Sequence, residues 1–128
     1  MGEFICFLGK RKEVKNMRKQ KYKGRCEKRM LSKSDQVCRF YSDLQSKYAD
    51  KLDSDNDIEQ IQCNIYLCNT EYMSDFLCTR KNGDVFIREC VERRFLNKPM
   101  TIKLLDISRN YWLNHGIEDW GIVTNVEE

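Results

Sequence analysis

The stretch from Tyr72 to Cys90, YMSDFLCTRKNGDVFIREC, decides how the fold is interpreted, because it predicts a β-hairpin with one acidic residue in each arm. Apolar and β-branched residues dominate both arms, and residues 81–83 between them contain Asn-Gly. Glycine readily adopts the left-handed conformation that closes a three-residue hairpin loop. The stretch therefore predicts strands over residues 73–79 and 85–91.

The length of the hairpin loop decides which residues face each other. If residues 81–83 form the loop, Arg80 faces Asp84, and counting outward places Asp75 opposite Glu89 on the same face. A two-residue Asn-Gly loop shifts the register by one residue, so that Asp75 faces Cys90 and Glu89 lies on the other face. Because directly opposed like charges destabilise a sheet, the first register predicts a positive group between the two acids.

A divalent metal ion is the simplest candidate for that positive group. Mg²⁺ takes oxygen ligands and keeps several waters, so Asp75, Glu89 and one backbone carbonyl would be enough to hold it. Such a site is typical of metal-assisted phosphodiester hydrolysis. The alternative is that both acids are solvated surface charges with Arg88, Arg93 and Arg94 as ion-pair partners.

Two helices and two more strands are predicted around the hairpin. Apolar residues recur at helical spacing at Leu31, Cys38, Tyr41, Leu44, Tyr48 and Leu52. They predict a first helix over residues 31–52, and the alternation that follows predicts a strand over residues 61–67.

The C-terminal part predicts one helix and one strand. Pro99 suits a first helical position and His115-Gly116 a helix end, so we expect a helix between them. Residues 120–126 alternate like a last strand. The fold class is therefore α/β, with the element order α, β, β, β, α, β.

Composition and charge indicate one domain that follows a basic arm. Hydrophobic residues make up 41% of the 128-residue chain, which suffices for one core and hardly for two. The net charge is +3, but residues 1–30 hold 11 Lys and Arg against 3 acidic residues. We therefore divide the chain into a basic arm, residues 1–30, and a domain, residues 31–128.

The basic arm suits a polyanion such as double-stranded DNA, whose phosphates bind Lys and Arg side chains. The candidate DNA contacts are Lys19, Lys21, Lys23 and Arg25. The alternative is a solvated tail without a partner.

The seven cysteines are odd in number, irregularly spaced and without a CxxC pair. With His115 as the single histidine, they predict neither a disulfide framework nor a zinc site, but small core residues of a reduced, cytosolic protein. The apolar run at residues 4–8 is too short for a signal peptide or a membrane span.

Three stretches carry a likeness to a known family: LSKSD (31–35), MSDFLCTRKNGDVFIRECV (73–91) and KLLDISRNYWLNHGIEDWGIVTN (103–125). With the predicted element order, they resemble the restriction-endonuclease-like nucleases of the PD-(D/E)xK group. More narrowly, they resemble the TnsA-type endonuclease subunit of heteromeric transposases. The likeness covers about residues 31–124 and implies a restriction-endonuclease-like core, a mixed sheet flanked by helices.

The resemblance implies a set of site residues. The family's helical acid falls on Asp35, or on Gln36 if the alignment slips by one residue. Its strand Asp falls on Asp75 and its second metal ligand on Glu89, with the Cys90 carbonyl completing the coordination of Mg²⁺ or Mn²⁺.

Val91 is the chief departure from the family, because it stands where the family has a catalytic Lys. Valine can neither orient the attacking water nor offset charge on the phosphorane. Either a nearby cation replaces the Lys, with Lys98 as our candidate among Arg93, Arg94 and Lys103, or the domain binds metal and DNA but cuts poorly.

The function implied by the resemblance is that of a Mg²⁺-dependent endodeoxyribonuclease that cuts at the 5′ side of transposon ends. Its implied partners are a DDE-type transposase subunit and an ATP-dependent transposition regulator in a bacterial-type cytosol, at the nucleoid. The alternative is a catalytically impaired, nuclease-like module that binds DNA and docks on the transposase. A generic nucleic-acid-binding domain would explain neither acid of the hairpin.

Overall fold

The computed structural model describes residues 26–67 and 72–125. In chain order the elements are β1 (Glu27–Arg29), β2 (Cys38–Phe40), α2 (Asp43–Asp53), β3 (Ile58–Tyr66), β4 (Met73–Arg80), β5 (Val85–Cys90), the short 3₁₀ helix η3 (Arg93–Phe95), α3 (Pro99–Asn114) and β6 (Trp120–Val123). No helix in this described part has the length and apolar character needed to cross a membrane. The candidate DNA contacts Lys19, Lys21, Lys23 and Arg25 lie outside the described residues.

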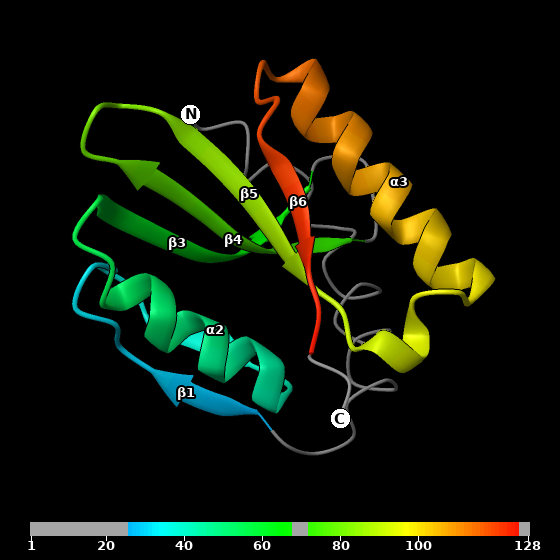
Figure 1. The fold of residues 1–128 in the computed structure, drawn as a ribbon, viewed down its shortest axis with the longest axis horizontal. Coiled ribbons are helices and arrows are strands. Elements are labelled where there is room, and N and C mark those ends of the chain that lie inside the picture. Colours follow the sequence, from blue (N-terminus) through cyan, green and yellow to red (C-terminus); the bar gives the residue numbers. More distant parts are fainter. Residues whose placement is uncertain (1–25, 68–71, 126–128) are drawn as a thin grey trace.

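Four strands form a mixed sheet in the order β3-β4-β5-β6, and β1 and β2 form a separate two-stranded sheet (Figure 1). β3, β4 and β5 are antiparallel, whereas β6 runs parallel to β5. The parallel connection is made through α3, as a crossover between parallel strands requires. The predicted α/β class, with a mixed sheet and a helix on either side of it, is confirmed at this level.

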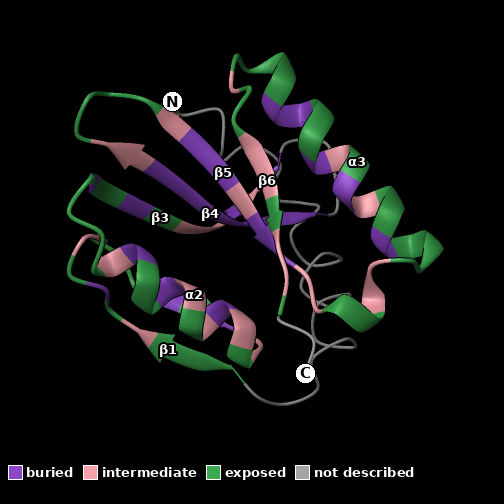
Figure 2. Cartoon of the chain, in the orientation of Figure 1, coloured by how far each residue is buried: buried purple, intermediate pink, exposed green. Residues whose placement is uncertain are grey.

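Each face of the sheet is covered by one helix, and each interface has its own core. Phe76 and Phe86 pack with Leu52 and Ala49 of α2. The alternate residues Leu77 and Ile87 pack with Trp112 of α3. Because successive side chains of a strand point to opposite faces, α2 and α3 lie on opposite sides of the sheet. The buried central strands stand out in Figure 2.

The hairpin of β4 and β5 has the three-residue loop that the sequence predicts. Thr79 pairs with Val85, and the Arg80 amide donates to the Asp84 carbonyl at 2.8 Å. Gly83 has a φ of 96°, in the left-handed region where glycine is favoured. The register in which Asp75 stands opposite Glu89 is therefore confirmed.

The predicted first helix, residues 31–52, is wrong in its N-terminal half. Residues 38–40 form β2, and α2 begins only after Ser42, whose hydroxyl accepts a hydrogen bond from the Gln45 amide at 3.3 Å. Leu31 and Cys38 are buried as expected, but burial at a spacing of seven residues does not require a helix. β1, which we assigned to the basic arm, pairs with β2 and so belongs to the fold.

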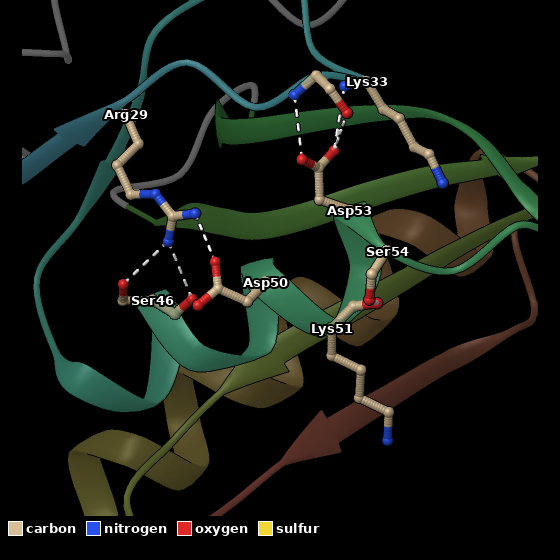
Figure 3. A network of polar contacts seen from close by, with 8 residues as sticks. Arg29, Lys33, Ser46, Asp50, Lys51, Asp53 and Ser54 are labelled. Carbon is tan, nitrogen blue, oxygen red and sulfur yellow. Dashed lines mark hydrogen bonds and ion pairs between the residues drawn. The ribbon is translucent and has the colours of Figure 1, made fainter.

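Polar contacts attach the small sheet and the turn between its two strands to α2 (Figure 3). Arg29 Nη1 donates to the Ser46 carbonyl at 3.2 Å and to its hydroxyl at 3.1 Å. At the other end of the helix, Asp53 accepts from the Ser32 and Lys33 amides, both at 3.1 Å. These contacts fix the rotation of α2, and with it the side chain that the helix presents to β4.

Candidate functional site

Asp75 and Glu89 stand opposite each other one residue beyond the last regular pair of the β4–β5 ladder, Phe76 with Arg88. Both are buried, with exposed fractions of 4% and 0%. At this point side-chain oxygens take the place of backbone carbonyls as hydrogen-bond acceptors. Glu89 Oε1 accepts from the Asp75 amide at 2.9 Å, and Asp75 Oδ2 accepts from the Cys90 amide at 2.8 Å. The pair is thus part of the interior of the protein.

Four neutral groups donate hydrogen bonds to Glu89, two to each carboxylate oxygen. Oε1 accepts from the Tyr72 hydroxyl at 3.0 Å and from the Asp75 amide. Oε2 accepts from the Ser74 and Ser108 hydroxyls, both at 2.6 Å. Short bonds of this kind are typical of hydroxyls that donate to an ionised carboxylate.

Two indole groups form an outer layer around the Glu89 carboxylate. Trp112 Nε1 donates to Ser74 Oγ, and Trp120 Nε1 donates to Ser108 Oγ, both at 2.9 Å. Each serine thus accepts from a tryptophan and donates to Glu89, which fixes the direction of its hydroxyl proton. The network joins β4, β5, α3 and β6 around one carboxylate.

The Asp75 carboxylate reaches the opposite layer of the structure. Its Oδ1 accepts from Gln45 Nε2 of α2 at 3.0 Å, and Gln45 Oε1 in turn accepts from the Tyr41 amide at 2.6 Å. Glu89, by contrast, reaches Ser108 of α3. The register of the hairpin is the expected one. The expectation that both carboxylates share one face of the sheet is wrong, because Asp75 turns toward α2 and Glu89 toward α3.

Burial raises the pKa of Glu89 to about 7, and the charge of Asp75 adds to this effect. The hydrogen bonds from Ser108, Ser74 and the Asp75 amide act in the opposite direction, because they stabilise the ionised form. Burial also raises the pKa of the Cys90 thiol, with Asp75 as the next cause. That thiol therefore stays protonated at neutral pH.

Two of the predicted catalytic residues are not assembled with this pair. Asp35 is exposed in a bend before β2 and is not helical, so the assignment of a helical acid at this position is wrong. The same holds for the alternative, Gln36, which is exposed in the same bend. Lys98 is exposed at the N-cap of α3, where its Nζ lies 6.0 Å from the centre of the Phe95 ring.

Gln45 is the residue that sequence reasoning missed. It is the α2 side chain that contacts Asp75, and it is 1% exposed. The signal was present, because Ser42 and Gln45 have the spacing of a capping box, which marks the start of a helix. A helix begun at Ser42 places Gln45 in its first turn, facing β4.

The carboxylate pair, as it is arranged, does not fit a Mg²⁺ ion. Within residues 26–67 and 72–125, no group of three or more His, Cys, Asp or Glu side chains is placed to hold a metal. Both oxygens of Glu89 and both of Asp75 already accept hydrogen bonds. A hard cation needs several oxygen ligands directed at one point, and here the two carboxylates diverge.

No protein-family model matches the sequence, and a search among curated proteins finds no significant match either.

Proposed function

We propose that this chain is a nuclease-like subunit of a heteromeric transposase, of the TnsA type, that binds double-stranded DNA and docks on the transposase without cutting DNA itself. The resemblance of residues 73–91 and 103–125 supports the family. The mixed sheet with one helix on each face is compatible with a restriction-endonuclease-like core. The basic arm supports DNA as the ligand.

The burial and hydrogen bonding of Glu89 are the main support for a role without DNA cleavage. Its carboxylate is 0% exposed and is held by four neutral donors. A metal ligand or a general base has to reach solvent or substrate, which this group does not. Glu89 acts instead as an internal anchor for α3 and β6.

Two neighbouring positions support the same role. Gln45, the α2 side chain at Asp75, is a neutral amide, whereas the resemblance implies an acid on the first helix. Val91, at the position of the family's Lys, is half-buried, and its amide donates to the Val123 carbonyl at 2.9 Å. Of the four positions that the resemblance implies for catalysis, Asp35 keeps an acid but is not helical, and Val91 lacks the Lys. Asp75 and Glu89 keep the expected residue type.

The endonuclease itself is the second candidate function, and the hairpin register favours it. The register brings together the two acids that the resemblance implies as metal ligands, since the Asp75 amide donates to Glu89 Oε1. For this function the carboxylate of Glu89 must leave its serine donors when DNA and the transposase bind.

One assay separates the two candidates. The full chain is incubated with a labelled double-stranded DNA oligonucleotide and Mg²⁺ or Mn²⁺, with and without the DDE-type subunit, and each sample is run on a native and on a denaturing gel. We expect retarded DNA that stays intact. Cleavage that disappears in Asp75→Ala would establish the endonuclease, and an absence of retardation would refute DNA binding.

A further inference from the structure

Cys38 of β2 and Cys63 of β3 belong to the same core, between α2 and the sheet. The Cys63 thiol lies near enough to Cys38 to act on its pKa. The adjacent residues fix the two strands in place: the Arg39 amide donates to Asn64 Oδ1 at 2.8 Å, and Asn64 Nδ2 donates to the Arg39 carbonyl at 2.9 Å. These bonds hold the two strands side by side next to the cysteines.

The surroundings of Cys38 favour a thiolate. The neighbouring Cys63 thiol lowers the pKa of the Cys38 thiol to about 7, and the Ser34 hydroxyl and the charge of Arg29 also lower it, against the effect of burial. Cys38 and burial both raise the pKa of the Cys63 thiol. A thiolate beside a second thiol is the arrangement in which oxidation leads to a disulfide.

The other thiols of the described residues differ from this pair. Cys26 is exposed. Burial raises the pKa of Cys78 to about 12 and also raises that of Cys90, so both stay protonated and unreactive. Cys63 is only half-buried and gives a small oxidant access to the pair.

We propose that Cys38 and Cys63 are an oxidation site at which a hydroperoxide joins β2 to β3 by a disulfide. Two S–H bonds and the O–O bond of hydrogen peroxide break, and one S–S bond forms. The two thiols give up two electrons, and the peroxide leaves as two water molecules. Thiol reductants reverse the reaction.

The disulfide would enclose all of α2, because the helix lies between the two cysteines in the chain. Closing this loop restricts the unfolded chain and stabilises the folded one. It would also hold Gln45 at Asp75. Oxidation is therefore expected to raise the melting temperature by several degrees.

The test uses the full chain, treated with hydrogen peroxide at pH 7.5 or kept in dithiothreitol. Remaining thiols are alkylated, and the digested protein is sequenced by tandem mass spectrometry. We expect Cys38 linked to Cys63, with Cys78 and Cys90 recovered as thiols that react only after denaturation. The proposal is overturned if Cys38 alkylates equally well before and after oxidation, or if its partner in the folded chain is another cysteine.

Cys63→Ser and Cys78→Ser provide matched controls, because both remove one thiol from the same side of the sheet. The first should lose the link and the rise in melting temperature, whereas the second should keep both. An equal rise in the Cys63→Ser variant would contradict the assignment.

Discussion

At the scale of single residues, Glu89 is the most informative, because it is an ionisable group with 0% exposure and four neutral donors. Glu89→Ala leaves these donors without an acceptor, and unsatisfied buried donors outweigh the relief of repulsion from Asp75. We expect the free energy of unfolding to fall by about 2–4 kcal/mol. Urea denaturation measures it, with the exposed Glu118→Ala as the control. Equal stability of the two variants would show that Glu89 is no anchor.

The raised pKa of Glu89 also predicts how stability depends on pH. With a folded pKa of about 7 against an ordinary value of 4.5, the native state binds more protons than the unfolded state between these values. The contribution of Glu89 to the free energy of unfolding is therefore fully present below pH 4.5. It declines by about 3 kcal/mol as the pH rises to 7. Glu89→Gln lacks this dependence.

Urea denaturation of the wild type and of Glu89→Gln at pH 5 and pH 8 tests whether stability falls as the pH rises. The stability of the wild type relative to the variant should decrease from the lower to the higher pH. A constant difference between the two proteins would mean that Glu89 titrates normally, in contact with solvent.

The candidate site was predictable from the sequence only in part. Loop length was enough to place Asp75 opposite Glu89, because register follows from local turn geometry. The partners of Glu89 were not predictable, because Ser74 and Ser108 come from elements far apart in the chain. Serine and tryptophan in a strand or helix carry no local signal of a hydrogen bond to a distant carboxylate.

At the scale of elements, the β4–β5 hairpin depends on the backbone of Gly83. Its φ of 96° is unfavourable for other residues, although an added Cβ would meet no atom within 4 Å. We therefore expect Gly83→Ala to destabilise the protein by about 1 kcal/mol through backbone strain alone. Thermal unfolding with the exposed Lys81→Ala as control checks this. A loss of less than about 0.3 kcal/mol would mean that the loop relaxes.

The elements differ in how well the sequence predicted them. β4, β5 and α3 were placed nearly correctly, because Asn-Gly and Pro99 mark their ends and strong periodicity fills them. The first helix was placed 12 residues too early. Leu31 and Cys38 extended its apolar pattern, but they reach the core from extended chain that tertiary contacts with α2 hold in place.

At the scale of the whole molecule, the basic arm and the folded domain divide the proposed work. In the proposed function the arm binds DNA through its positive charge, and we expect binding that weakens steeply with salt. Neutralising Lys19, Lys21, Lys23 and Arg25 to Gln should flatten the plot of log affinity against log salt by about 3–4 units. Fluorescence anisotropy with a DNA duplex measures this slope. If the quadruple variant kept the wild-type slope, the arm would be a solvated tail that does not bind DNA.

The measurement that tests the central claim most directly is Mg²⁺ titration by calorimetry, on the wild type and on Gln45→Glu. Gln45 is the neutral neighbour of Asp75, and an acid in its place would put two carboxylates from α2 and β4 in contact. We predict no binding heat for the wild type and a measurable Kd for Gln45→Glu, because only the variant directs two carboxylates at one point. Mg²⁺ binding by the wild type that is lost in Asp75→Ala would contradict the account and favour the endonuclease.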